Sequence, residues 1–462
     1  MKVHNTLSGK KEEFQPLQAG KVGMYLCGPT VYDLGHLGHG RSVVSFDVIR
    51  KYLIYKGFQV KFVTNYTDID DKMIKRAAEM NISVPQLAEK IIPEYVKDYG
   101  ALGVMPGDVQ PRATDYVKPM IELISLLEQK GYTYLLDDGV YFEVKKFAEY
   151  GKLSKQKLDE LKSGARVDVK AGKRSPQDFV LWKFSKPGEP KWDSPWGEGR
   201  PGWHIECSAM SRELLGETFD IHGGGMDLIF PHHECEIAQS ESAYEKPFAK
   251  YWLHNGFINI DKEKMSKSLG NFFTIRDVLQ KYPAQAVRLL FLQTHYRSPI
   301  EFSDDILGQA KNGLARIQNF VKILDLYYKE LNLKGVSEPQ DTWGEKYLED
   351  FEYYMDDDFD TPGALGTVFS LISQINSLHV LGTLTKTDLD AAVEALKKMH
   401  SVLGIIFIDD KPLNHDTQAL IQEREDARKA KDWKRSDEIR DHLFTQGIIL
   451  EDTPKGTVWK RG

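Results

Sequence analysis

The chain has 462 residues, of which 41% are hydrophobic and 28% charged, a composition that excludes a disordered or collagen-like protein. At roughly 150 residues per domain, this length predicts about three domains. The 61 Lys and Arg against 68 Asp and Glu give a net charge of −7, which excludes a protein that is basic throughout. A nucleic-acid partner would therefore need local basic patches.

The first part of the chain has the pattern of a β-α-β unit. Apolar residues alternate over 22–27, which predicts a strand that ends at Gly28-Pro29. Apolar residues then recur at helical spacing over 41–55, and Gly57 follows where a helix C-cap glycine belongs. A second strand is predicted over 58–62, and the acid-rich segment 67–71 is typical of a helix start. This order predicts an α/β fold with a doubly wound parallel sheet, Rossmann-like in type.

Residues 112–195 are rich in Gly, Asp, Lys, Pro and Trp after a helical piece at 120–130, which indicates a loop-rich insertion. The α/β pattern then resumes. We expect a short strand over 218–222 that runs into three glycines, a helix that begins at Pro231, and a strand over 251–260.

The remainder is predicted to be helical, followed by a small C-terminal part. Helices are expected over 306–331, 345–354, 362–381 and 386–403, and 409–412 has the composition of a linker. The last 45 or so residues predict a charged helix, a turn at Gly447 and a short β-like end. The domain boundaries that follow are 1–111, 112–195, 196–262, 263–305, 306–408 and 409–462.

The cysteines and the N-terminus bear on the cellular compartment. No run of 18 apolar residues occurs, so no membrane span is expected, and the N-terminus lacks the apolar core of a secretory signal. The three cysteines, Cys27, Cys207 and Cys235, are too few for a disulfide framework. We therefore expect a cytoplasmic protein.

The segment His36-Leu37-Gly38-His39 lies just past the first predicted strand, where a helix opens. Ligands of open α/β sheets bind beyond the carboxyl ends of strands, and a helix N-terminus there attracts phosphate. Gly38 allows close approach of the backbone, and the two imidazoles can donate hydrogen bonds to phosphate oxygens. The alternative is two exposed histidines in a loop.

The segment Lys264-Met265-Ser266-Lys267-Ser268 follows the predicted strand over 251–260. Two lysines three residues apart can bring positive charge to a polyphosphate, although a solvated basic turn has the same composition. The two segments together, about 225 residues apart, resemble the two signature motifs of class I aminoacyl-tRNA synthetases.

A third group of residues has the chemistry of metal ligands. His232 and Glu236 are four residues apart and share a helix face, Cys27 ends the first strand, and Cys207 begins the second α/β half. Thiolates and imidazole are ligands that zinc selects, and a carboxylate can complete the shell. Two cysteines this far apart can equally be buried without a metal, and on softness alone Cys235 can replace Glu236.

Three longer segments resemble the cysteinyl-tRNA synthetase family: Cys-Gly-Pro-Thr-Val-Tyr-Asp from Cys27, Trp-His-Ile-Glu-Cys-Ser-Ala-Met from Trp203, and His-Gly-Gly-Gly-Met-Asp-Leu-Ile-Phe-Pro-His-His-Glu-Cys-Glu from His222. The resemblance runs nearly end to end. It implies one zinc bound by Cys27, Cys207, His232 and Glu236, with Cys235 an incidental thiol. It also implies that ATP with Mg, L-cysteine and tRNA(Cys) are substrates.

The resemblance also assigns roles to individual residues. His36, His39, Lys264 and Lys267 would stabilise the triphosphate during adenylate formation, and Gly38, Gly224 and Asp227 would help to bind ATP. The substrate pocket would include Thr67, Trp203, His204 and His222, although Trp203 can also be a plain core residue. A pocket selective by shape alone separates cysteine from serine by only ~1–3 kcal/mol, whereas zinc prefers the thiolate. The insertion is small for a hydrolytic domain, so no editing activity is expected.

Binding of tRNA is expected in the C-terminal domain, where the family has its anticodon-binding domain. Cations and one tryptophan gather there at Arg428, Lys429, Lys431, Trp433, Lys434 and Arg435, a phosphate-binding and base-stacking composition. The alternative is a solvated helix face. The acidic run over 349–360 would repel phosphate, so we interpret it as structural, with Asp360 capping a helix.

Two other functions fit parts of the same sequence. The related cysteine ligase of mycothiol synthesis uses an amino-sugar acceptor but lacks the C-terminal anticodon-binding domain. A non-catalytic synthetase-like RNA-binding protein would not need the intact catalytic motifs. The family is commonly monomeric, so a monomer is expected.

Overall fold

The computed structural model describes residues 1–156, 172–260, 263–264, 273–334, 343–406, 415–445, 448–453 and 456–461. The signature lysine Lys267, the predicted linker over 409–412 and the predicted turn at Gly447 lie outside the described residues. The chain forms two compact units. One comprises Met1–Leu307 and Met355–Asp360, and the other comprises Gly308–Tyr354 and Thr361–Gly462.

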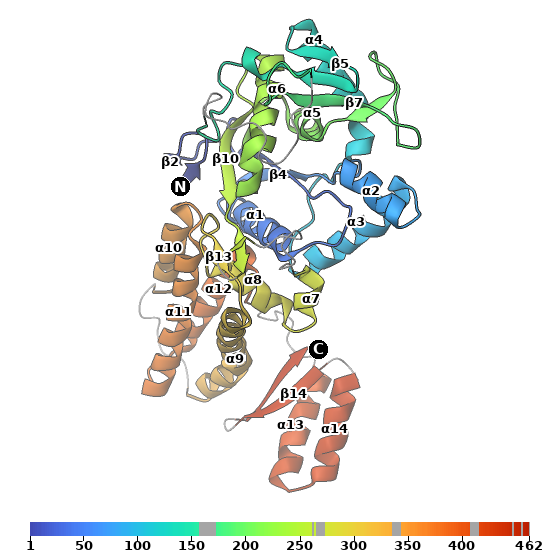
Figure 1. Cartoon of the computed structure of the whole chain (residues 1–462). Coiled ribbons are helices and arrows are strands. Elements are labelled where there is room, and N and C mark those ends of the chain that lie inside the picture. Colours follow the sequence, from blue (N-terminus) through green and yellow to red (C-terminus); the bar gives the residue numbers. More distant parts are fainter. Residues whose placement is uncertain are drawn as a thin grey trace. The chain divides into compact units, whose positions relative to one another are not determined.

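The first unit is built on a four-stranded parallel sheet (Figure 1). Its strands in spatial order are β10 (Ala249–Asn255), β9 (Phe219–Gly225), β3 (Lys21–Leu26) and β4 (Gln59–Thr64). Helix α1 (Leu37–Tyr55) connects β3 to β4, and α6 (Glu234–Tyr244) lies between β9 and β10 in the chain. The central position of β3 and β9 brings the carboxyl ends of both halves together. The predicted doubly wound parallel sheet is thus confirmed.

Helix α1 begins at Leu37, four residues before the predicted start at Arg41. His36 has the extended backbone of an N-cap residue, so the second histidine of the motif lies in the first helical turn. The helix ends at Tyr55, and Gly57 has the positive φ of 89° that favours glycine. The motif therefore caps and opens a helix rather than forming an exposed loop.

The predicted insertion contains far more regular structure than its composition indicates. Helix α4 (Val117–Gln129) is followed by an antiparallel sheet of β5 (Thr133–Leu136), β6 (Gly139–Phe142) and β7 (Phe179–Phe184). The fourth strand of this sheet, β8 (Gly199–Pro201), lies just beyond the predicted end of the insertion at residue 195. Phe142 and Trp182 are buried in its core. The expectation of a loop-rich segment is wrong here, because strands of three to six residues between turns leave little period-two signal.

The predicted strand over 251–260 is two strands. β10 ends at Asn255, and β11 (Ile258–Ile260) joins a separate small sheet between β12 (Glu263–Lys264) and β13 (Ile300–Glu301). The break falls at Gly256, where a Cβ would come within 2.5 Å of the carbonyl oxygen of Ser298. The first signature lysine is thus carried by the short strand β12.

Elsewhere in the first unit, short elements flank the central sheet. These are β1 (Lys2–Asn5), β2 (Lys10–Glu13), α2 (Asp71–Glu79), α3 (Val84–Ala101), α5 (Trp203–Leu215), α7 (Ile275–Leu279) and α8 (Ala284–Leu292). Asp70 caps α2 by accepting a hydrogen bond from the backbone N–H of Lys72, in agreement with the predicted acid-rich helix start.

The second unit is mostly helical, as predicted. Its helices are α9 (Asp304–Lys334, which begins in the first unit), α10 (Trp343–Asp356), α11 (Thr361–Leu381), α12 (Lys386–Leu403), α13 (His415–Lys429) and α14 (Trp433–Thr445), followed by the hairpin of β14 (Ile448–Thr453) and β15 (Gly456–Arg461). Helix α11 is long and apolar enough to meet the length criterion for a membrane span, and buries one apolar face within the protein. The single charged helix predicted near the C-terminus is wrong: it is two helices, because Lys431 adopts a left-handed conformation with φ of 61°.

Candidate active site and metal centre

The four predicted metal ligands converge beyond the carboxyl ends of β3 and β9. Cys27 directly follows β3, Cys207 lies on α5, His232 lies in the turn before α6, and Glu236 lies on α6 itself. One ligand atom from each residue lies within 4.8 Å of every other. The Sγ atoms of Cys27 and Cys207 are 3.6 Å apart, and Nε2 of His232 is 3.0 Å from Oε1 of Glu236.

The donor set fits zinc. Zn–S bonds of about 2.3 Å at tetrahedral angles place two sulfur ligands about 3.8 Å apart, close to the observed spacing. Cys207, His232 and Glu236 are almost fully buried. Burial raises the pKa of the Cys27 thiol and lowers the pKa of His232 well below its usual value, so the imidazole is neutral with a lone pair to donate. A cation would stabilise the thiolates that burial alone disfavours.

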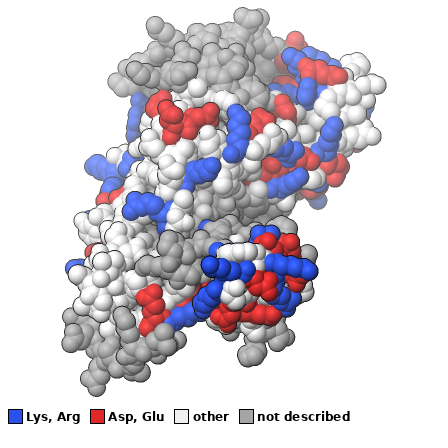
Figure 2. Space-filling view, turned by 90° about the horizontal axis from the view of Figure 1, so that it is seen from below, with Lys and Arg blue, Asp and Glu red and all other residues white. Residues whose placement is uncertain are grey.

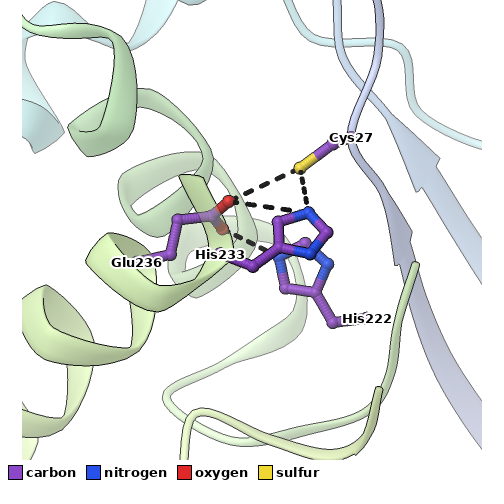
Figure 3. A group of neighbouring side chains, drawn as sticks. All are labelled: Cys27, His222, His233 and Glu236. Atoms are coloured by element: carbon purple, nitrogen blue, oxygen red, sulfur yellow. Dashed lines mark hydrogen bonds and ion pairs between the residues drawn. The ribbon is translucent and has the colours of Figure 1, made fainter. Parts of the chain in front are cut away.

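A second set of four donors overlaps the first and consists of Cys27, His222, His233 and Glu236 (Figure 3). Nε2 of His233 lies 3.3 Å from Sγ of Cys27, and Nε2 of His222 lies 2.8 Å from Oε2 of Glu236. His233 is not among the ligands predicted from the sequence. The only signal was its place beside His232 and three residues before Glu236, on the same helix face.

His233 is itself held by a chain of hydrogen bonds. Its Nδ1 lies 2.8 Å from Nε2 of His254 at the end of β10, and Nδ1 of His254 lies 2.8 Å from Oγ1 of Thr6. Burial lowers the pKa of His254 to about 3, so this imidazole is neutral. These hydrogen bonds fix the orientation of the His233 ring beside the candidate metal ligands.

Trp203 and His204 lie against the same cluster. The Trp203 ring stacks on His232 with centroids 4.2 Å apart, yet the residue is 38% exposed. That exposure favours a pocket wall over the alternative of plain core packing. Nδ1 of His204 lies 2.9 Å from Nδ1 of His232, and burial lowers the pKa of His204 to about 3.

Thr67 belongs to a buried hydrogen-bond network, of which only Thr67 was predicted from the sequence to be a site residue. Its hydroxyl donates to Oε2 of Glu206 at 2.7 Å and accepts from Nδ2 of Asn65 at 3.3 Å. Asn65 Oδ1 accepts from the backbone N–H of Gly28 at 2.8 Å. A Cβ on Gly28 would lie 1.6 Å from the backbone oxygen of Asn65, so only glycine allows this approach. Asn65 lies outside the quoted motifs, and Glu206 lies within the segment from Trp203 without having been given a role.

The two histidines of the first motif lie together at the start of α1. Their rings stack with centroids 3.7 Å apart. Nδ1 of His39 accepts a hydrogen bond of 3.2 Å from the backbone N–H of His36, so the neutral His39 ring carries its proton on Nε2. This tautomer places an N–H group at the ring edge, the kind of group that contact with a phosphate oxygen requires.

The C-terminal end of the segment with the two signature lysines lies against the first motif. The backbone N–H of Leu37 donates to the carbonyl of Phe273 at 3.1 Å, and that of Ile275 donates to the carbonyl of Gly35 at 2.9 Å. Lys264 lies on β12, whereas Lys267 is outside the described residues. The residues that follow the second motif are thus paired with the first motif, which lies more than 200 residues earlier in the sequence.

The remaining predicted ATP contacts lie at the same edge of the sheet. Gly38 is in the first turn of α1. Gly224 is near the end of β9, and a Cβ there would meet Cε1 of His233 at 2.8 Å. Asp227 is exposed in the turn that follows.

Cys235 lies close to the metal candidates but belongs to neither donor set among the described residues. Its Sγ lies 3.3 Å from the hydroxyl oxygen of Tyr150. Burial raises the pKa of this thiol, so it stays protonated.

The predicted tRNA-binding cations occupy the end of α13, the break and the start of α14. Lys431, Trp433, Lys434 and Arg435 are exposed, and the Arg428 guanidinium lies 5.8 Å from the centre of the Trp433 ring. Some of these cations are paired: Arg435 contacts Glu423 and Glu438. On the face drawn in Figure 2, Lys and Arg side chains lie beside Asp and Glu over much of the described surface. Any tRNA contact there is therefore made by local groups of cations.

Comparison with known proteins identifies the family. Residues 13–312 match the tRNA synthetases class I (C) catalytic domain, residues 350–407 the DALR domain, and residues 410–459 the cysteinyl-tRNA ligase anticodon binding domain. The chain belongs to the cysteine–tRNA ligase family. The cysteine–tRNA ligase of Thermodesulfovibrio yellowstonii is 52% identical over all of this chain and 99% of its own length. The enzymes of Carboxydothermus hydrogenoformans and Vibrio parahaemolyticus are 51% and 49% identical over the whole of both chains.

Solved structures of other synthetases share the fold of this member of the cysteine–tRNA ligase family, although their sequences are less than 20% identical to it. A methionyl-tRNA synthetase of Mycobacterium tuberculosis in complex with methionyl-adenylate has a TM-score of 0.64 and 17% identity, covering 83% of this chain and 92% of its own. A leucyl enzyme of Agrobacterium radiobacter in a ternary complex has a TM-score of 0.62 and 11% identity, covering 85% of each chain. These likenesses confirm a class I synthetase fold. The anticodon-binding match at 410–459 favours tRNA over an amino-sugar acceptor.

Proposed function

We propose that this protein ligates L-cysteine to tRNA(Cys) in two steps. The cysteine carboxylate attacks the α-phosphorus of ATP, which forms cysteinyl-adenylate and releases pyrophosphate. A ribose hydroxyl at the 3′ end of the tRNA then attacks the adenylate carbonyl and releases AMP. One observation carries this proposal: the four candidate zinc ligands and the His36–His39 motif lie at the same edge of the parallel sheet.

Positioning and charge stabilisation carry the rate in such a reaction, and no protein nucleophile is needed. His36 and His39 donate to the triphosphate from the start of α1, where the helix N-terminus adds positive potential. Lys264 and Lys267 neutralise charge on the phosphates, and Mg accompanies ATP. Gly38, Gly224 and Asp227 contribute to the ATP site at the carboxyl edge of the sheet.

For the metal, we infer that Cys27, Cys207, His232 and Glu236 hold one zinc ion. This set contains two thiols, and zinc selects soft ligands, so we favour it over the set with His222 and His233. When bound, zinc supplies a soft Lewis acid that favours the thiolate of cysteine over the hydroxyl of serine.

Around this centre, Thr67, Trp203, His204 and His222 form the cysteine pocket. The Thr67 hydroxyl donates its hydrogen bond to Glu206, so toward the substrate it can only accept one. An acceptor at this position suits the ammonium group of the substrate. Trp203 covers the ring of His232 and presents its exposed part toward solvent.

Binding of tRNA is assigned to Arg428, Lys429, Lys431, Trp433, Lys434 and Arg435. Trp433 is 56% exposed, which leaves a ring face for a base. We place the protein in the cytoplasm, because translation supplies its tRNA there and the thiols need a reducing compartment. We propose that it acts as a monomer, as is common in this family.

The test measures cysteine-dependent ATP–pyrophosphate exchange, transfer of cysteine to tRNA and zinc content. The parent chain is expected to perform both steps with one zinc per chain. Cys207→Ser should lose the zinc and most of the exchange, whereas Cys235→Ser, which alters a buried thiol outside the donor set, should keep both. Exchange without transfer would point to the amino-sugar ligase, and loss of zinc with full activity would refute the metal assignment.

A second pair of variants separates the two donor sets. His232→Gln should lower zinc content if the two-thiol set holds the ion, and His233→Gln should leave zinc content near one per chain. The reverse result would assign the ion to the set with His222 and His233. Metal analysis decides this independently of activity.

A further inference from the structure

Arg41 is a buried charged residue of α1, two positions after His39, and it is fully inaccessible to solvent. Its guanidinium donates from Nη1 to the carbonyl of Phe257 at 2.6 Å and from Nη2 to the carbonyl of Tyr296 at 3.2 Å. Nη2 also contacts the carbonyls of His295, at 3.3 Å, and Ser298. All the partners that the structure describes for this guanidinium are backbone carbonyls. Burial lowers the pKa of Arg41 to about 9, so the group stays charged near neutral pH.

These carbonyls precede two strands of the small sheet that carries the first signature lysine. Phe257 directly precedes β11, whose antiparallel partner β12 contains Lys264. Residues 295–298 precede β13, which pairs with β11 on its other side. Arg41 therefore joins the helix that begins with the His36–His39 motif to the base of the sheet that carries Lys264.

The loop of residues 295–298 is also held on a second side. Oδ2 of Asp358 accepts from Nε of Arg297 at 2.7 Å, and Oδ1 of Asp358 accepts from the hydroxyl of Tyr296 at 3.0 Å. Asp358 is fully buried and lies in the segment Met355–Asp360, which belongs to the first unit. The acidic run interpreted as structural thus fixes the loop that Arg41 contacts. This attachment leaves the loop little freedom to follow Arg41 if α1 shifts.

We propose that Arg41 is a positioning residue for adenylate formation, which holds the strand with Lys264 at a fixed distance from His36 and His39. The inference rests on the proposed function. A planar guanidinium can bind carbonyls of two chain segments at once, whereas a lysine ammonium is a point charge on a flexible stem. The exit of the lysine segment is attached separately, through the backbone pairing of Phe273 and Ile275. Arg41 supplies the matching attachment at its entrance.

The test compares Arg41→Lys with Arg50→Lys in steady-state pyrophosphate exchange. Arg50 is a matched control on the same helix: it is 4% exposed and donates to the carbonyl of Pro106 at 2.6 Å and to Asp108 at 2.8 Å, away from the small sheet. A displacement of about 1 Å can reduce a rate about 100-fold. We expect Arg41→Lys to lower kcat about 30-fold or more with KM for cysteine within 2-fold, and Arg50→Lys to change kcat less than about 3-fold.

A merely structural role would alter these parameters differently. If Arg41→Lys raised KM for cysteine as much as it lowered kcat, or if Arg50→Lys matched it, the positioning role would be wrong. In a Lys264→Ala background, Arg41→Lys should cost at most a few-fold more, because both act through the same strand. Independent, multiplicative losses would contradict the proposal.

A folded Arg41→Lys with normal kcat would overturn this inference alone, whereas a parent chain without cysteine-dependent exchange would overturn the proposed function. If Arg41→Lys does not fold, Arg297→Gln asks the same question, because the Arg297 side chain is 30% exposed and holds the loop from the Asp358 side. It should lower kcat at constant KM for cysteine, and an unchanged kcat would refute the inference.

Discussion

Replacing Asp47 by Asn should destabilise the catalytic unit strongly, because Asp47 is the carboxylate shared by two cations inside the protein. Its Oδ2 accepts from Nη2 of Arg288 on α8 at 2.6 Å and from Nζ of Lys51 at 2.7 Å, and its Oδ1 accepts from the backbone N–H of Met105 at 2.9 Å. The side chains of Asp47 and Arg288 are each 1% exposed. Asn keeps the shape and one oxygen, but it turns an amide donor or a neutral oxygen toward both cations.

The expected loss follows from the burial of the pair. Removing one partner of a buried ion pair costs about 3–5 kcal/mol. Arg288 keeps hydrogen bonds to the carbonyls of Leu102 and Gly103 at 3.1 and 3.3 Å, which favours the lower end, about 3 kcal/mol. A unit of roughly 300 residues has an unfolding entropy of ~0.6 kcal/mol/K, so the melting temperature should fall by about 5 °C.

The assay measures thermal unfolding of the full chain by calorimetry, with Asp108→Asn as the control. Asp108 also pairs with an arginine of α1, Arg50, but its side chain is 41% exposed. Solvent screening limits the contribution of that ion pair to stability to about 1 kcal/mol. The melting temperature of the Asp108→Asn variant should therefore fall by less than about 2 °C. Equal shifts for the two variants, or an Asp47→Asn protein within 1 °C of the parent, would refute the assignment of the large loss to burial.

Other consequences are open to direct measurement. Trp203→Ala should raise KM for cysteine about 10-fold in pyrophosphate exchange, whereas Trp203→Phe, which keeps a ring over His232, should raise it less; equal effects would exclude the stacked ring as the cause. The pKa of His204 and His254, lowered by burial to about 3, lies below the unfolded value of about 6.5. Their contribution to stability is complete above pH 6.5 and is lost as the pH falls toward 3, so these two histidines alone should make the metal-free protein about 3 kcal/mol less stable to urea at pH 5.5 than at pH 7.5. The buried His232 and His233, whose pKa is also lowered, add to this loss, so the total should be at least that large. Trp433→Ala should raise KM for tRNA about 10-fold and leave pyrophosphate exchange unchanged; an equal fall in exchange would contradict a role in tRNA binding alone.

Local patterns predicted the elements whose contacts are local. The alternation over 22–27 corresponds to β3, and the helical period over 41–55 lies within α1. Both signals come from apolar residues that lie near one another in the sequence. The break at Gly256 has no such signal. It depends on the close approach of Ser298, which is 42 residues away in the sequence and adjacent only in the fold.

The site shows the same division. Cys27, Cys207, His232 and Glu236 come from separate elements, so their spacing in the sequence did not indicate a metal centre, and the resemblance to a family did. Residues that act on ligands through other residues were missed. Glu206 contacts Thr67 across 139 positions, and its role appears only when the hydrogen bond is seen.

Helix α1 explains why buried polar anchors escape a search for periodicity. Apolar and charged residues are buried on all sides of this helix. The sequence pattern therefore does not separate a buried apolar face from an exposed polar one, and buried charged residues cannot be recognised from it. Arg41, Asp47 and Arg50 lie in successive turns of the helix and bind different segments. Arg41 binds the carbonyl of Phe257, Asp47 binds Arg288 and Arg50 binds Asp108. Only the attachment nearest the first turn, at Arg41, leads to the strand with Lys264. The three anchors should therefore separate by their effects: Asp47 chiefly stabilises the fold, Arg50 neither stabilises it strongly nor limits the rate, and Arg41 limits the rate at constant affinity for cysteine.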